Sequence, residues 1–359
     1  MVNRLPGWTG GGTRRRPAGG EDVDLELEPY RVELTGYCYR MLGSPFEAED
    51  AVQETLVRAW RNRDRYDPDR APLRAWLYRI ATTICLDMLR GAQRRARAMD
   101  LGPAAGHGAD LGAPLPESAW VQPVPDGRVL RLDGDPAEVA AERETIRLAF
   151  VAALQHLPPR QRAVLILREV LCWRADEVAG LLDTTVASVN SALQRARATL
   201  RTPPPSEPYR PLDEGQRSLL VRYCDAFQRY DVDALVSLLH EDATTSMPPF
   251  VWWRRGRAEI REMLLAAGNP CAGARLVPTV ANGSPAFGQY LPAGDGDRYT
   301  PFALVVLTVS TGGRVADGGR VAGNGEPALI TELTTYLDPD RLFPVFDLPH
   351  GPEPVELPR

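Results

Sequence analysis

One segment carries the side chains best suited to reading a base sequence. Apolar residues recur there at intervals of three and four, which predicts a helix with one buried face: Val186, Val189, Leu193, Ala196 and Leu200. The opposite face is polar and basic: Ser188, Asn190, Ser191, Gln194, Arg195 and Arg197. In the DNA major groove Asn and Gln suit adenine, while Arg suits guanine or a phosphate. The segment is therefore a candidate recognition helix, although a plain amphipathic hairpin has the same spacing.

A helix-turn-helix would hold that face outward. Residues 174–182 form a short apolar-periodic helix, Asp183-Thr184 supply the turn, and Thr185 can cap the next helix. Short polar side chains near the start of the second helix can then reach base edges, and the later arginines can hold phosphates.

Charge is distributed unevenly in the first third of the chain. The net charge is −5, but residues 21–54 hold ten acidic residues against two Arg, and residues 58–97 hold eleven Arg against four Asp. An acidic surface beside a basic one indicates two different partners. The alternative is two solvated helix faces that happen to differ in sign.

These charges lie on predicted helices. Ser44, Pro45 and Glu47 form a strong helix start, with an N-cap, a proline at N1 and an acid at N3. We expect this helix to bury Val52, Leu56, Ala59 and Trp60. Pro72 opens the next helix, which we expect to end in Arg90, Arg94, Arg95 and Arg97. Its apolar stripe is Leu73, Trp76, Leu77, Ile80, Ala81, Ile84 and Met88.

Composition divides the remaining chain. Residues 1–22 resemble a flexible tail, 23–97 form the first helical unit, and the Gly- and Pro-rich residues 98–134 form a linker. Asp135-Pro136 starts a second helical unit over 135–202, which Pro158-Pro159 interrupt. A Pro-rich linker covers 203–211. An α+β domain with a mostly antiparallel sheet covers 212–337, with strands expected at 243–251, 274–281, 286–292, 300–310 and 326–337, and 338–359 form a tail.

Several classes of protein are disfavoured. No apolar run is long enough to span a membrane, and no signal peptide is evident, so we expect a cytoplasmic protein. The five cysteines are scattered without a CxxC pair, which fits buried thiols in a reducing compartment rather than a metal site. We therefore predict no metal and no cofactor.

The helical half resembles the extracytoplasmic-function (ECF) sigma factors of RNA polymerase. Residues 49–55 (EDAVQET), 58–60 (RAW), 74–81 (RAWLYRIA) and 86–90 (LDMLR) are similar to sigma region 2. Residues 157–162 (LPPRQR), 189–191 (VNS) and 195–197 (RAR) are similar to sigma region 4. The order and spacing of these motifs make the resemblance specific, and it covers about half of the chain.

The resemblance implies a partner for each surface. The core polymerase, through its β′ clamp helices, would bind Asp50, Gln53, Glu54 and Val57, and its β flap is a further contact. The minus-ten promoter element would bind Arg70, Arg74, Arg79, Thr82, Thr83, Asp87, Arg90 and Arg94. The minus-thirty-five element would bind Thr185, Ser188, Asn190, Ser191, Gln194, Arg195 and Arg197. Trp76 lies on the apolar stripe and fits the core better than a base stack. An anti-sigma factor is a further partner that the resemblance leaves open.

Three positions depart from the region 4 pattern. Asn190 replaces the usual Lys, Ala192 a frequent Arg, and Asp183 a common Gly in the turn. Each change lowers the local positive charge, which puts the strength of minus-thirty-five binding in doubt.

The C-terminal half resembles the SnoaL-like branch of the NTF2-like fold, a curved sheet closed by helices into a cone. The matching residues are 223–227 (YCDAF), 231–235 (DVDAL), 240–243 (HEDA), 247–249 (MPP) and 253–257 (WRRGR), with a helix expected after them, and 338–343 (DPDRLF) match the closing motif. The resemblance implies a ligand cavity near Asp225, His240, Trp252 and Trp253, with Asp242 beside them. Because no catalytic constellation is evident, we predict a regulatory domain and no enzyme.

Two other functions remain open. A stand-alone helix-turn-helix regulator would bind duplex DNA tightly without polymerase. An NTF2-like enzyme with a regulatory helical half would show turnover in the isolated C-terminal fragment.

Overall fold

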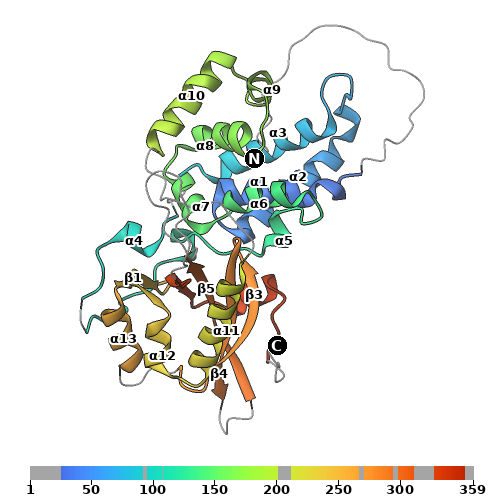
Figure 1. Ribbon diagram of the computed structural model, residues 1–359. Helices are drawn as coiled ribbons and strands as arrows, with labels where there is room; N and C mark the ends of the chain where they lie inside the picture. The colour runs from blue at the N-terminus through green and yellow to red at the C-terminus, as the bar shows by residue number, and fades with distance from the viewer. Residues whose placement is uncertain are drawn as a thin grey trace, which may run out of the picture.

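A computed structural model describes residues 26–91, 95–106, 108–200, 212–266, 271–293, 298–310 and 327–351. The predicted N-terminal tail, the Pro-rich linker 203–211 and the glycine-rich segment 312–325 lie outside these residues, as does most of the tail after 351. In Figure 1 the helical half lies above and the α+β domain below. None of the helices in the described ranges is long and apolar enough to cross a membrane.

The first helical unit consists of α1 (Arg31–Leu42), α2 (Pro45–Arg61) and α3 (Leu73–Met88). Ser44 caps α2 as predicted, since its Oγ accepts a hydrogen bond from the backbone N–H of Glu47 at 3.4 Å. Two sequence predictions are wrong here. Trp60 is 61% exposed, because it lies one position beyond the buried stripe at the solvent end of α2. The third helix ends at Met88, and Arg95 is buried, with its guanidinium donating to Glu47 and to backbone carbonyls of the linker.

The linker is folded against both halves of the molecule. It contains α4 (Ala98–Leu101) and α5 (Asp126–Val129), with a 3₁₀ turn at Glu117–Ala119. It buries Trp120, Val121, Val124, Val129 and Leu130. The absence of periodicity was a correct signal for irregular backbone, but it gave no indication of this burial.

The second helical unit runs from α6 (Pro136–Glu144) to α10 (Val186–Thr199), through α7 (Leu148–Gln155), α8 (Pro159–Leu165), a π turn (Ile166–Val170) and α9 (Ala175–Leu181). Asp135 caps α6 as predicted, but the helix breaks at residues 145–147 before it resumes as α7. Buried residues of both helical units form one continuous core, so the units pack directly on each other. Tyr78 of α3 and Trp173, for example, have ring centroids 5.1 Å apart.

The C-terminal domain, here called the cone domain (residues 212–351), begins with α11 (Glu214–Gln228) and α12 (Val232–Ser237). Its strands are β1 (Leu239–Ser246), β2 (Trp253–Arg255), β3 (Arg275–Ala281), β4 (Ser284–Ala293), β5 (Arg298–Val309) and β6 (Ile330–Tyr336), with α13 (Arg257–Leu265) after β2 and α14 (Pro339–Val345) at the end. The order is β2-β1-β6-β5-β4-β3, and only the β1–β6 pair is parallel, so the mostly antiparallel sheet is confirmed. The short strand β2 was not predicted separately.

Alternation along the strands gives the sheet two buried faces. Val305 and Leu307 of β5 face the cluster formed with α11, α12 and α13, whereas Leu304 and Val306 face the cluster formed with α14. Helices therefore cover both faces of the sheet.

The tip of the β3–β4 hairpin points into the helical half. Its two loop residues, Asn282 and Gly283, have φ of +55° and +69°, as a two-residue hairpin turn of the I′ type requires. Asn282 is fully buried although it lies at the end of a hairpin. The hairpin tip is thus the point where the cone domain meets both helical units.

Candidate nucleic-acid and polymerase interface

The predicted recognition helix is present and its polar face is exposed. Thr185 caps α10, with its Oγ1 accepting from the backbone N–H of Ser188 at 3.2 Å. The residues predicted to read the minus-thirty-five element are all exposed: Thr185, Ser188, Asn190, Ser191, Gln194, Arg195 and Arg197. Arg197 forms an ion pair with Glu169. The prediction that Val186 is buried is wrong. It is 43% exposed, because it lies in the first turn of α10, before the part of the apolar face that packs on neighbouring elements.

Asp183 links this motif to the basic face of α3. Its φ of +49° explains why glycine is common at such a turn, and its carboxylate accepts from the Arg79 guanidinium at 2.5 Å. Both side chains are well exposed, so the pair by itself contributes little to stability. It nevertheless connects a predicted minus-ten residue to the helix-turn-helix.

The remaining minus-ten candidates are placed differently from one another. Arg74 is half-buried, donates to Glu33 at 3.1 Å, and lies over the rings of Tyr78 and Trp173. Asp87 and Arg90 are exposed and form an ion pair of 3.3 Å. Arg70 is exposed, and Arg94 lies outside the described residues.

Thr82 and Thr83 of α3 differ in burial. Thr83 is exposed, as predicted, but Thr82 is buried and its hydroxyl donates to the Tyr78 carbonyl at 2.6 Å. The Tyr37 hydroxyl lies 2.8 Å from the same oxygen. The expectation that Thr82 faces DNA is therefore wrong, because α1 covers the side of α3 next to the apolar stripe.

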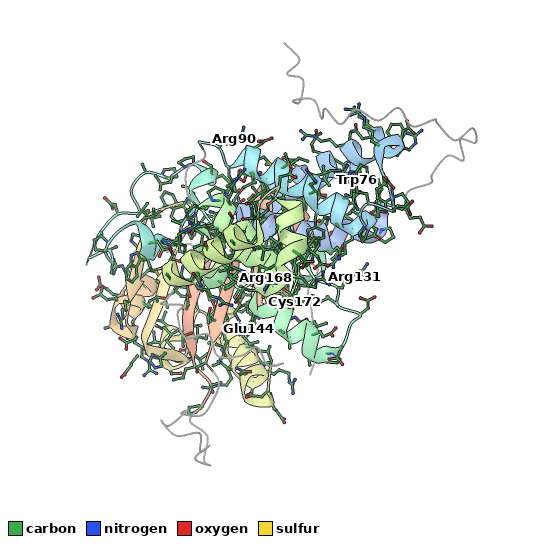
Figure 2. All side chains as sticks on the ribbon, turned by 90° about the horizontal axis from the view of Figure 1, so that it is seen from above. Trp76, Arg90, Arg131, Glu144, Arg168 and Cys172 are labelled. Carbon is green, nitrogen blue, oxygen red and sulfur yellow. The ribbon has the colours of Figure 1, made fainter. Side chains whose placement is uncertain are left out.

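Trp76 lies between core and surface. It packs against the core, as predicted, yet it is only partly buried and its ring is 5.1 Å from that of Tyr66. Figure 2 shows it near one end of α3, with Arg90 beyond the other end.

A cleft of about 1110 Å³ separates the predicted minus-ten face from the helix-turn-helix. One wall holds cationic and aromatic groups: Arg65, Tyr66, Arg70, Arg74, Trp76 and Arg79. The other wall holds acidic groups of the second helical unit: Asp176, Glu177 and Asp183. The two walls are complementary in charge, and α9 faces arginines that were predicted to bind the minus-ten element.

The predicted polymerase face lies on α2. Asp50 and Gln53 are exposed, Val57 is half-buried, and Glu54 pairs with Arg58 at 2.5 Å. Sequence reasoning missed Trp60, whose exposed ring lies 5.1 Å beneath the Arg63 guanidinium. Because Arg61 and Asn62 follow Trp60 in the sequence, Trp60 could have been recognised as lying at the end of the helix.

The four residues predicted around a cone cavity line neither of the two pockets described here. His240 Nδ1 accepts from the backbone N–H of Asp242, whose carboxylate pairs with Arg255 at 3.1 Å. Asp225 lies on α11 and is only partly exposed. The indoles of Trp252 and Trp253 instead donate to linker carbonyls, those of Ala109 at 3.4 Å and Gly102 at 3.0 Å.

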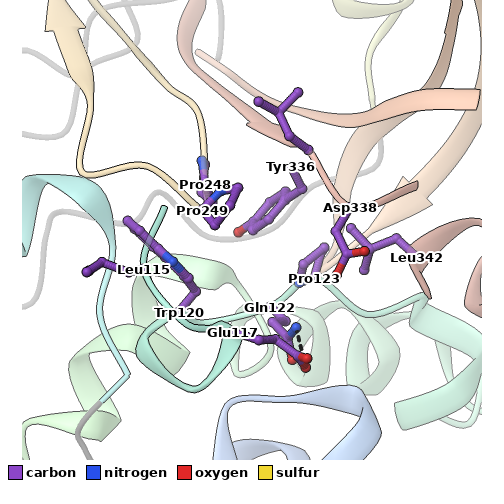
Figure 3. A pocket seen from close by; sticks show the side chains of 11 residues that line it. Leu115, Glu117, Trp120, Gln122, Pro123, Pro248, Pro249, Tyr336, Asp338 and Leu342 are labelled. Carbon is purple, nitrogen blue, oxygen red and sulfur yellow. Dashed lines mark hydrogen bonds between the residues drawn. The ribbon is translucent and has the colours of Figure 1, made fainter. Parts of the chain in front are cut away.

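The linker thus lies against β2 and the segment that precedes it in the cone domain. Two backbone hydrogen bonds of 2.8 Å add to the indole contacts, from Ala105 N–H to the Trp253 carbonyl and from Leu115 N–H to the Pro249 carbonyl. A pocket of about 180 Å³ remains at this seam and is lined by other residues, including Trp120, Pro249, Tyr336 and Asp338 (Figure 3). Among the described residues, no group of three His, Cys, Asp or Glu side chains could hold a metal ion.

The hairpin tip is held by a dense set of hydrogen bonds. Asn282 Nδ2 donates to Tyr39 Oη at 2.7 Å and to the Ile146 carbonyl at 2.5 Å, and its Oδ1 accepts from Val124 N–H at 2.9 Å. Gly283 N–H donates to Asp126 at 2.8 Å. Burial raises the pKa of Asp126, although this hydrogen bond and Arg143 oppose the shift. One asparagine side chain therefore joins both helical units and the linker to the cone domain.

Three family models match the chain in the same order as these units. Residues 27–95 match Sigma-70 region 2, residues 147–200 match Sigma-70 region 4, and residues 220–318 match the SnoaL-like domain.

Two relatives match the chain over most of its length. The chain is 42% identical to the ECF RNA polymerase sigma factor SigG of Mycobacterium tuberculosis over 335 residues, which cover 91% of this chain and 84% of SigG. It is 30% identical to SigJ of the same organism over 298 residues, 80% of this chain and 88% of SigJ. The crystal structure of SigJ superposes with a TM-score of 0.54 at 25% identity, covering 90% of this chain and 99% of SigJ. The chain therefore belongs to the ECF sigma factors of RNA polymerase, and it carries a C-terminal SnoaL-like domain.

Proposed function

We propose that this sigma factor binds core RNA polymerase, directs it to promoters with two surfaces, and is held in a closed resting form by its own cone domain. The acidic face of α2 docks on the polymerase, with Asp50 and Glu54 supplying charge complementarity that orients the encounter. The exposed face of α10 reads the minus-thirty-five element, and Arg70, Arg74, Arg79 and Thr83 contact the minus-ten element. The protein acts in the cytoplasm, where it meets the polymerase.

The burial of Asn282 is the observation that supports regulation by the cone domain. Both helical units contribute hydrogen bonds to this one side chain, so the hairpin tip stabilises their contact with each other. The minus-ten and minus-thirty-five elements are about 25 base pairs apart, roughly 85 Å of duplex at about 3.4 Å per base pair. Two units that share one core cannot reach both elements at once, so the closed form must open when the promoter is bound.

Opening has a modest electrostatic component. The Arg79–Asp183 pair competes with DNA for Arg79, and the acidic residues of α9 cover part of the minus-ten face. Promoter DNA would favour the open form, because that form alone can place both DNA-binding surfaces on their elements.

We infer that the cone domain regulates without catalysing a reaction. A general acid–base pair must converge on one substrate position. Asp225 and His240 lie on different elements, and the Trp252 and Trp253 indole N–H groups are bonded to the linker. The alternative of an enzyme predicts turnover by the cone domain, which a screen of the full chain against small carbonyl substrates would detect.

In vitro transcription tests the proposal. Purified protein is added to sigma-free core polymerase on pooled genomic DNA, and the 5′ ends of the transcripts are sequenced. We expect defined start sites that share two upstream motifs and that are lost in an Asp50→Asn, Glu54→Gln double variant. Specific duplex binding by the protein alone, with no initiation in the presence of core polymerase, would instead support a stand-alone regulator.

A second variant tests the resting form. Asn282→Asp keeps the shape and the left-handed backbone, but it places a carboxylate oxygen against the Ile146 carbonyl and buries a charge. We expect this change to release the hairpin tip and to raise transcription at low polymerase concentration. Val280→Thr, at an exposed position on the same hairpin, is the control. Unchanged output from Asn282→Asp, with hydrogen exchange showing that the tip is released, would contradict the regulatory role.

A further inference from the structure

The pocket at the seam between the linker and the cone domain has a chemical character of its own. Its walls come from two parts of the chain, Leu115, Trp120 and Pro123 from the linker and Pro248, Pro249 and Tyr336 from the cone domain. Figure 3 shows Trp120 on one side of the pocket and Asp338 on the other, with Tyr336 between them. The volume of about 180 Å³ is close to that of a cavity of about 150 Å³ that holds benzene.

The two carboxylates that line the pocket differ in their partners. Glu117 is neutralised by an ion pair with Arg341 and also accepts from Gln122 at 2.8 Å. The Arg341 guanidinium lies over the Phe46 ring, 4.0 Å from its centroid. Asp338, in contrast, forms no ion pair with any cation in the described part of the chain.

The Asp338 carboxylate is therefore available to a cationic ligand. Burial raises the pKa of Asp338, opposed by the backbone N–H of Arg341 and assisted by the charge of Asp340. A cation at the pocket would oppose this shift. Aromatic rings beside a carboxylate are the surroundings that bind alkylammonium groups, because ring faces and carboxylates both attract positive charge.

We propose that this pocket binds a small organic cation, an alkyl- or arylammonium whose apolar body packs against Trp120, Tyr336 and Pro249 and whose charge faces Asp338. The ligand would contact the linker and the cone domain together. By linkage, a ligand that binds only the docked arrangement stabilises that arrangement. This proposal goes beyond the sigma function, and its failure would leave that function untouched.

Binding is measured on the full chain without polymerase, using two matched pairs of probes. Choline is compared with 3,3-dimethylbutan-1-ol, its neutral isostere, and benzylammonium with benzyl alcohol. We expect at least one cation to bind saturably and about tenfold more tightly than its neutral counterpart. Absence of saturable binding of both cations up to about 10 mM, or equal affinity for cation and alcohol, would overturn the proposal.

Two neighbouring carboxylates locate the site. Asp338→Asn preserves an N-cap residue for α14 and removes only the charge, so it should fold and weaken cation binding about tenfold. Asp340→Asn, on the same helix but outside the pocket, should change it less than about threefold. Hydrogen exchange of the backbone N–H groups of Leu115 and Val121 should slow when the cation is bound. Equal effects of the two substitutions, or exchange that the ligand does not alter, would place the cation elsewhere and refute the pocket.

Discussion

Adjacent threonines on α3 separate a structural role from a DNA-binding role. The Thr82 hydroxyl is the hydrogen-bond partner of buried Tyr37, whereas Thr83 is exposed and donates only to the Arg79 carbonyl in its own helix. We predict that Thr82→Val costs about 1–3 kcal/mol in the free energy of unfolding, because the Tyr37 hydroxyl is left buried without its partner. Thr83→Val should change it by less than about 0.5 kcal/mol.

Chemical denaturation measures the free energy of unfolding of both variants. Promoter opening with core polymerase measures their DNA-binding role. We expect Thr83→Val to weaken opening while Thr82→Val leaves it unchanged at a temperature where the variant is folded. The reverse pattern, with stability lost at Thr83 and opening lost at Thr82, would mean that the face of α3 assigned to DNA is wrong.

At the scale of the elements, helix packing overrides helix propensity at one glycine. A Cβ on Gly36 of α1 would lie 2.3 Å from the backbone carbonyl oxygen of Val129 in the linker helix α5, so the two helices would have to separate. Gly180 in α9 has no atom within 4 Å of such a Cβ. We predict that Gly36→Ala destabilises by about 1–3 kcal/mol, while Gly180→Ala stabilises by about 0.4–1 kcal/mol.

Thermal or urea unfolding of the two variants checks this pair. Both substitutions exchange the same residues in a helix, so a difference in sign isolates the contact between α1 and α5. Stabilisation by Gly36→Ala would show that the linker does not press on α1 in solution.

Helix positions could be predicted from the sequence, whereas burial at the edges of the helices could not. The period of three and four residues predicted α10 and its exposed face, and capping residues predicted the starts of α2 and α6, because these signals act within one turn of the chain. Trp60, Thr82 and Val186 were assigned to the wrong side, since each lies at the edge of a stripe where a neighbouring helix decides burial. Asn282-Gly283 could be recognised as a hairpin turn from its residues, but its burial depends on three segments more than a hundred residues away in the sequence.

For the whole molecule, the contact between the helical half and the cone domain depends on neutral tyrosines. Tyr39 donates to the Gln122 carbonyl at 2.7 Å and accepts from Asn282, and Tyr336 donates to the Val121 carbonyl at 3.2 Å. Burial raises the pKa of both phenols far above the ordinary value of 10, with Asn282 opposing the shift at Tyr39. A phenol in either position therefore holds its proton as long as the contact is closed.

The contact is therefore less stable at high pH. Because the folded pKa values lie above the unfolded ones, the stabilisation is fully present below about pH 10 and is lost as pH rises further, at about 1.4 kcal/mol per pH unit for each such tyrosine. We predict that the part of the tyrosinate absorbance that Tyr39→Phe removes appears together with an increase in hydrodynamic radius, in one cooperative step. Tyr39→Phe, which removes one of these phenols and two of its hydrogen bonds, should weaken the contact at neutral pH and make the increase in radius above pH 10 less steep. Tyr66→Phe, at a partly exposed ring remote from the contact, should leave it unchanged. If that part of the absorbance rose gradually from pH 10 at constant radius, solvent would reach the Tyr39 phenol in the closed form, and the cone domain would not be bound as tightly as its hairpin tip implies.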